Sequence, residues 1–263
     1  MFETRSVLTR VALTALLAVM VIPFLIPLFT MVHGSLQGRG WENYRAVIEL
    51  EGFYLYFRNS AIIAVATIAI VYFLTLTASF GFSKLRIRSK EVYFWLLMGA
   101  LTMPEVVLLA PLVIQVSQAG IAGTFWAVII PLVALQIPFT VLLTRSYVDG
   151  IPDALIEAAR MDGAGTVRQF WHLVVPLAKP MAVAIVVLVL INSWNAYLLP
   201  LVFLGQTEGH MVVTQLPNSF KTQYTDDQTK ILAGAVLAAL PEIIAYICLQ
   251  RYFERGMAAG AVK

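Results

Sequence analysis

The chain has 263 residues, of which 60% are hydrophobic and only 13% are charged, and its formal net charge is +3. Soluble domains are usually about a quarter charged, so this composition excludes an ordinary water-soluble domain and indicates an integral membrane protein. Because Cys248 is the single cysteine, an intrachain disulfide is excluded. Its place in an apolar run favours a packing role.

The first apolar stretch, residues 11–32, follows the basic segment MFETRSVLTR. It is longer than the apolar region of a typical signal peptide, and no A-x-A cleavage site follows it. We therefore expect an uncleaved first span, kinked by Pro23 and Pro27.

The remaining apolar stretches are also long enough to cross about 30 Å of hydrocarbon as helices, the default in lipid, where exposed backbone groups find no partner. The expected fold class is all-α, with one transmembrane domain over residues 1–263 and six transmembrane helices. We place the spans near 7–33, 58–83, 92–117, 122–145, 176–204 and 229–253.

The distribution of basic residues predicts the orientation. With the N-terminus inside, 13 of the 18 Lys and Arg residues fall in cytoplasmic segments, four of them in the short loop SKLRIRSKE. The positive-inside rule then places both termini and the segment 146–175 in the cytoplasm, and the loop 205–228 outside. The basic residues of 84–90 could also contact anionic membrane lipid, although orientation alone explains them, and no nucleic-acid interpretation is needed.

The segment 146–175 contains a charged, Ala- and Gly-rich helix, EAARMDGAG. Asp153 is a candidate N-cap, so we expect a helix over about 154–162 that ends with Gly163 in the C′ position. A Glu157–Arg160 ion pair is geometrically available on it.

A second short helix fits from Thr166, hinged to the first at residues 163–165. The alanine face of the first helix permits close approach to a partner surface. The second helix should carry one apolar stripe, formed by Val167, Phe170, Trp171 and Val174.

The spacing in this segment resembles the cytoplasmic loop of ABC importer permeases, whose pattern is Glu-Ala-Ala, three residues, Gly, nine residues, Ile, one residue, Leu-Pro. The chain has Glu157-Ala158-Ala159, Gly163, Leu173 and Val175-Pro176 at these positions. Leu for Ile and Val for Leu are the only departures, and both conserve apolar volume.

Further stretches resemble carbohydrate importers of the maltose type. They are WNAYLLPLVFL (194–204), the tail QRYFERGMAAGAVK, WENYRAVIE and RNSAIIA. The resemblance covers nearly the whole chain, best fits the six-span member of a pair of permease subunits, and implies the type I importer permease fold in a bacterial inner membrane.

The resemblance implies that the loop is a coupling helix seated on a separate ATPase. Its contact residues would be Glu157, Ala158, Ala159, Arg160, Asp162 and Gly163. The tail, with Arg255, Gly256 and Gly260, would lie near the ATPase dimer interface, and the loop 205–228 would face an extracytoplasmic binding protein. The implied partners are a second permease subunit in a heterodimer and two ATPase subunits that bind ATP and Mg²⁺.

The chain itself is expected to hold no cofactor and to catalyse no reaction. No G-x-x-x-x-G-K-[ST] pattern occurs, so ATP hydrolysis must come from another chain. His33, His172 and His210 are scattered without metal-ligand spacing, so we expect no metal site.

Two sets of polar residues are candidates for a substrate pathway. Glu105 and Glu242 each follow a proline inside an expected span, where they either line a cavity, cap a helix break or form structural hydrogen bonds. The second set either binds sugar hydroxyls and ring faces or forms interhelical hydrogen bonds to a partner subunit. It contains Asn192, Trp194, Asn195 and Tyr197.

The function expected from these features is ATP-driven import of a di- or oligosaccharide or related sugar, with this subunit converting ATPase motion into alternating access. Amino sugars and glycerol-phosphate-type compounds are alternative substrates. A stand-alone secondary carrier or channel is the rival, but it leaves the charged loop unexplained, and no inverted repeat is evident.

Overall fold

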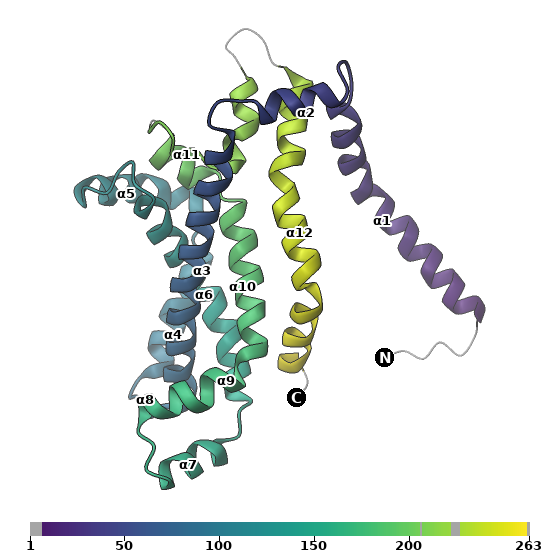
Figure 1. Cartoon of the computed structure of the whole chain (residues 1–263). Helices are drawn as coiled ribbons and strands as arrows, with labels where there is room; N and C mark the ends of the chain where they lie inside the picture. Colours follow the sequence, from purple (N-terminus) through teal and green to yellow (C-terminus); the bar gives the residue numbers. More distant parts are fainter. Residues whose placement is uncertain (1–6, 206, 222–226, 262–263) are drawn as a thin grey trace. The chain divides into compact units, whose positions relative to one another are not determined.

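The computed structural model describes residues 7–205, 207–221 and 227–261, with side chains described between residues 9 and 250 of these ranges. Its regular elements are helices, as expected for an all-α membrane protein (Figure 1). They are α1 (Val7–Ser35), α2 (Trp41–Ile48), α3 (Phe53–Lys84), α4 (Lys90–Gly99), α5 (Glu105–Gln118), α6 (Trp126–Asp149), α7 (Asp153–Met161), α8 (Thr166–Gln169), α9 (Val175–Leu177), α10 (Lys179–Trp194), α11 (Leu198–Leu204) and α12 (Gln228–Ala261), with short 3₁₀ helices at Ala100–Thr102 and Val213–Phe220.

Four of these helices, α1, α3, α6 and α12, are long and apolar enough to cross a membrane. The number rises to six if each of two bent helix pairs counts as one span. One pair is α4 with α5, bent by 104°, and the other joins the helical stretch 166–177 to α10 at 75°.

The break in the 92–117 stretch occurs at Pro104. Proline has no N–H to donate and disfavours helical geometry in the residue before it. Met103 is accordingly extended, at φ −90° and ψ 117°, and α5 begins directly after Pro104, at Glu105. By contrast, α12 continues through Pro241, so Glu242 caps no break.

The 176–204 stretch is also interrupted. Helix α10 ends at Trp194, and α11 begins at Leu198. Asn195, Ala196 and Tyr197 form the connection, so part of the expected polar and aromatic cluster lies where the helix is broken.

The chain divides into two units, residues 1–53 with 216–239 and residues 54–215 with 240–263. In the first unit, none of the residues in the apolar window of α1 is buried. The end of α1 is joined to α2 because Asn43 Nδ2 donates hydrogen bonds to the carbonyl oxygens of Ser35, at 2.9 Å, and Gln37, at 2.8 Å.

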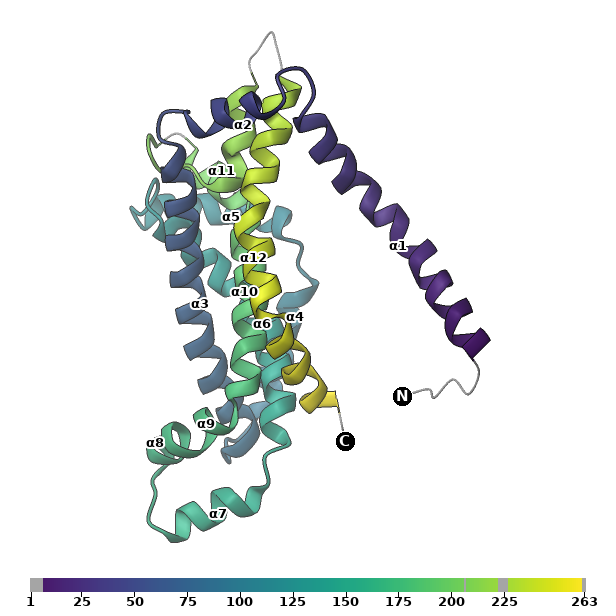
Figure 2. The ribbon, with the colours of Figure 1, turned by 45° about the vertical axis from the view of Figure 1, so that its right-hand side comes forward.

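The second unit has an apolar core in which α3, α5, α6, α10 and α11 contribute buried side chains. Hydroxyl groups also join α3 to α6, since Thr75 Oγ1 and Thr140 Oγ1 are hydrogen-bonded at 2.8 Å. In both views α7, α8 and α9 lie together beyond one end of α3 (Figures 1 and 2). A separate cluster packs this end, formed by Leu76, Phe80, Val148, Ile151, Ile156, Phe170, Val174 and Ala178.

Candidate functional site

Helix α7 ends in a complete Schellman turn. The amide of Gly163 donates to Arg160 O at 3.1 Å, and the amide of Ala164 donates to Ala159 O at 2.9 Å. This turn requires a left-handed residue at C′, and Gly163 has a φ of +77°. The expected helix end at Gly163 is therefore confirmed, and the turn explains the fixed spacing between the alanines and the glycine.

The surface of α7 faces away from the rest of its unit. Ile156 is its only buried residue. Glu157, Ala158 and Arg160 are exposed, and Met161 is 87% exposed. An amphipathic helix that exposes apolar and small side chains together presents a surface suited to a partner protein.

The expected role of Asp153 as an N-cap is wrong. The helix already begins at Asp153, Pro152 occupies the N-cap position, and no side-chain capping bond forms. The carboxylate of Asp153 instead accepts a hydrogen bond from Lys84 Nζ at 2.7 Å. This bond and the positive charge of Lys84 hold the pKa of Asp153 below its usual value.

Within the described residues, no ion pair joins Glu157 to Arg160, although the two are one turn apart. Both instead line a cavity of about 190 Å³ at the base of the loop. The remaining walls come largely from the segment 83–90 and from Asp153 and Ile156.

The expected apolar stripe on the second helix is also wrong. Phe170 and Val174 are buried, whereas Val167 is 72% exposed and Trp171 is 51% exposed. Residues Phe170–Val174 form a π turn, which spreads side chains differently around the axis from the 3.6-residue period behind the expectation. Trp171 stacks on Phe73 of α3, with ring centroids 6.4 Å apart.

A second candidate site is a cavity of about 640 Å³ in the same unit, comparable in size to known ligand sites. Four of the six candidate pathway residues line it together: Glu105, Asn192, Asn195 and Tyr197. Other lining residues, from α6, α10, the connection after α10 and the start of α11, are Leu132, Leu135, Gln136, Phe139, Thr140, Leu188, Ile191, Ala196 and Leu198.

The other two pathway candidates do not line this cavity. Trp194 is only 8% exposed and belongs to the buried residues of α10. Glu242 is not among the lining residues, but its carboxylate accepts a hydrogen bond of 2.8 Å from Asn195 Nδ2, which is one of them.

Gln136 and Thr140, which were not among the residues expected from the sequence, give α6 its polar contribution to the cavity. Gln136 Nε2 donates to Ser193 Oγ at 3.3 Å, while its Oε1 atom is buried and has no partner among the described residues. A glutamine within an otherwise apolar span was the available signal.

The segment after α11 is fastened to the start of α3. Asn59 Nδ2 donates to Gly209 O at 2.7 Å and to Met211 O at 2.9 Å, and Ser60 Oγ accepts from Val213 N at 2.9 Å. Within the expected loop 205–228, residues 206 and 222–226 lie outside the described residues. The backbone of α12 runs through Arg255, Gly256 and Gly260, but their surroundings lie outside the part of the chain whose side chains are described.

Residues 74–259 match the family model described as the binding-protein-dependent transport system inner membrane component. The chain belongs to this family. It is therefore the permease component of a binding-protein-dependent ABC transporter and a multi-pass inner-membrane protein, as the resemblance of the loop indicated.

The permease is 32% identical to the probable ABC transporter permease YurM of Bacillus subtilis, over 81% of this chain and 71% of that protein. It is 27% identical to the arabinooligosaccharide transport permease AraQ of the same organism, over 97% of this chain and 96% of that protein. A crystal structure of a bacterial ABC transporter that imports the acidic polysaccharide alginate contains a chain with a TM-score of 0.80 and 22% identity, covering 96% of this chain and 99% of that chain. This structural likeness shows a shared fold.

Proposed function

We propose that this permease moves a neutral oligosaccharide or related sugar across the inner membrane, in a heterodimer with a second permease subunit. Two ATPase subunits, which bind ATP and Mg²⁺, drive the cycle, and an extracytoplasmic binding protein delivers the sugar. Both chain termini lie in the cytoplasm in this arrangement, and the tail, with Arg255 and Gly260, lies near the ATPases.

The observation that carries the proposal is the exposed helix α7, which faces away from the rest of its unit and ends in the Schellman turn at Gly163. We assign α7 as the coupling helix, with Glu157, Ala158, Ala159, Arg160, Asp162 and Gly163 on or beside its ATPase contact. The exposed Ala158 permits close backbone approach, and the turn fixes the angle at which the chain leaves the helix.

The cavity lined by Glu105, Asn192, Asn195 and Tyr197 supports the proposed substrate class. Amide and hydroxyl groups beside apolar walls match the alternating hydroxyl and C–H surfaces of a sugar. The relative AraQ, named for arabinooligosaccharides, supports this class. Trp194 and Glu242 support the wall of this pathway instead of touching the sugar.

The charge of the cavity lining distinguishes neutral or amino sugars from anionic substrates. The described lining contains the carboxyl group of Glu105 and no Lys, Arg or His. In a site of low dielectric constant a carboxylate opposes a phosphate or uronate and tolerates a neutral or amino sugar. A glycerol-phosphate-type substrate therefore fits this half of the pathway poorly.

The proposal is tested by changing the exposed surface of α7. Met161→Glu places a charge on a side chain that is 87% exposed, so it should leave membrane insertion unchanged. We expect loss of ATPase copurification and of uptake, because a docked interface would bury the new charge. Arg88→Glu, at an exposed position on the 84–90 loop, is the control that also introduces a carboxylate. Normal copurification with the Met161 variant would contradict docking through α7.

A further inference from the structure

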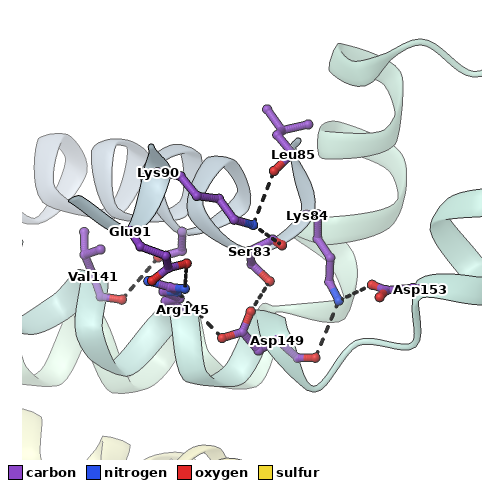
Figure 3. Close-up of polar contacts among 10 residues, drawn as sticks. Ser83, Lys84, Leu85, Lys90, Glu91, Val141, Arg145, Asp149 and Asp153 are labelled. Carbon is purple, nitrogen blue, oxygen red and sulfur yellow. Dashed lines mark hydrogen bonds and ion pairs between the residues drawn. The ribbon is translucent and has the colours of Figure 1, made fainter. Parts of the chain in front are cut away.

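Lys84, the last residue of α3, is half-buried as a whole, but its charged side chain is almost entirely covered. Its side chain is only 5% exposed. Its Nζ atom donates to Asp153 Oδ1 at 2.7 Å and lies 3.5 Å from Asp149 O (Figure 3). It also donates to Ile151 O at 2.6 Å. One ammonium group therefore joins the end of α3, the end of α6 and the first residue of α7.

The neighbouring contacts hold the same ends together. Ser83 Oγ donates to Asp149 Oδ1 at 2.6 Å, which joins α3 to α6 directly. Lys90 Nζ donates to the carbonyl oxygens of Ser83, at 3.2 Å, and Leu85, at 3.3 Å, and so caps the end of α3 (Figure 3). Cations at these positions face the negative ends of the helices, which stabilises them.

Arg145 extends the contacts to α4. Its guanidinium pairs with Glu91 at 2.5 Å and approaches Asp149 at 3.7 Å, and it lies 4.1 Å from the ring centre of Phe94. The adjoining ends of α3, α4 and α6 are thus held in one polar network.

The other basic residues of the same loop behave differently. Arg86 and Arg88 are exposed, and within the described residues neither has an ion-pair partner. Membrane orientation needs only the charge of these residues, whereas the position of Lys84 depends on specific acceptors. The four basic residues of 84–90 therefore fall into two groups with different environments.

Helix α7 has few other attachments to its unit. Its one buried side chain, Ile156, packs in the cluster with Leu76 and Phe80. Among the described side-chain hydrogen bonds and ion pairs, the bond from Lys84 to Asp153 is the only one that joins α7 to the ends of α3, α4 and α6. A force applied to α7 reaches the long helices through the chain itself, through Ile156 and through Lys84.

We propose that Lys84 is a positioning residue that transmits displacement of α7 to α3 and α6, an inference that rests on the proposed role of α7 as the coupling helix. Lys84 and its acceptors, Asp149, Ile151 and Asp153, form a coupling latch. Without the latch α7 still docks on the ATPase, but it moves partly independently of the long helices. ATP is then hydrolysed with less transport.

The latch is tested first by hydrogen exchange of the α7 amides in the full-length permease in nanodiscs. Lys84→Met keeps the length of the side chain and removes the donor. It should raise the exchange rate of α7 by roughly tenfold, because the carboxylate of Asp153 and the carbonyl of Ile151 both lose their donor. Arg86→Met, which removes the same charge from an exposed neighbour, should leave exchange unchanged.

The second measurement is the ratio of substrate transported to ATP hydrolysed in the assembled importer, a ratio that a purely structural role would not lower. We expect Lys84→Met to lower this ratio severalfold, Lys84→Arg to restore much of it, and Arg86→Met to leave it as in the wild type. Asp153→Ala removes only the exposed end of the latch, so it gives an informative result even if Lys84→Met does not fold.

Wild-type exchange of α7 in both Lys84→Met and Asp153→Ala would overturn the latch, as would an unchanged transport ratio in both. If the wild-type importer shows no ATP-coupled uptake, the proposed function fails instead. The exchange measurement still decides whether Lys84 fixes α7, because it needs neither ATPase nor substrate.

Discussion

Asn195 and Glu242 are 47 positions apart in the sequence, and their side chains are joined by a hydrogen bond of 2.8 Å. Asn195 also donates to Ile191 O of the preceding helix α10 at 3.1 Å, so its amide is oriented from two sides. The carboxylate of Glu242 therefore fixes a residue that lines the large cavity.

This relationship predicts a graded response at Glu242. Glu242→Gln retains an acceptor oxygen and should lower stability little. Glu242→Ala removes it and should cost about 1 kcal/mol. Asn195→Asp places two carboxyl groups together and should be the most damaging change at neutral pH. Thermal unfolding of the purified permease ranks the stabilities of the three variants. Equal stability of all three would show that the hydrogen bond between Asn195 and Glu242 contributes nothing.

Gln136 should give opposite effects on stability and transport. Its Oε1 atom is buried without a partner among the described residues, so Gln136→Met removes an unsatisfied acceptor. We expect unchanged or higher thermal stability together with reduced sugar uptake. Asn192→Ala is a useful comparison, because Asn192 bonds only the Leu188 carbonyl of its own helix among the described contacts. Full uptake in both variants would remove the cavity from the proposed pathway.

The Schellman turn predicts a position-specific cost at glycine. Gly163→Ala forces a side chain into a left-handed conformation, at a cost of about 1 kcal/mol. Gly165→Ala is the matched control, because Gly165 has a φ of −66° and open space around its Cα. We expect weaker ATPase copurification only for the Gly163 variant. An equal effect of both would indicate contact with the partner, not backbone conformation, as the cause.

Asp227 should cap α12 down to low pH. Its carboxylate accepts bonds from Thr229 Oγ1 at 2.8 Å and Lys230 N at 3.2 Å, and it pairs with Lys230 Nζ at 2.9 Å. The hydrogen bond from Lys230, followed by that from Thr229, lowers the pKa of Asp227 to about 2.

Because the folded pKa lies below the ordinary value of about 3.8, the stabilising contribution of Asp227 is complete above that value. It is lost as the pH falls towards 2. The carboxyl ¹³C shift of Asp227 should therefore titrate near pH 2, and Asp227→Ala should cost about 1 kcal/mol while Asp227→Asn retains most of the cap. Titration near pH 4 would contradict this arrangement.

Much of this structure followed from patterns that depend on local chemistry. Hydropathy predicted helices, and the glycine at position 163 predicted the end of α7 because few other residues adopt a positive φ. The broken helices at Pro104 and at Asn195 were harder to place, since apolar composition alone does not distinguish a straight span from a bent one.

Two of the errors involved contacts between distant segments, and a third involved local helix geometry. Asp153 had the composition of an N-cap, but Lys84, 69 positions away, takes its carboxylate. The basic loop was interpreted only through its charge, although Lys84 and Lys90 bind helix-end carbonyls. The π turn at Phe170 changed which side chains face inwards, and no residue pattern in FWHLV indicates it.

The most direct test of the account is uptake of a radiolabelled neutral oligosaccharide into proteoliposomes containing the assembled importer. We expect uptake to require both ATP and the binding protein, and Met161→Glu to abolish it without loss of the permease from the membrane. Uptake by this permease alone, driven by an ion gradient and unaffected by ATP, would contradict the account.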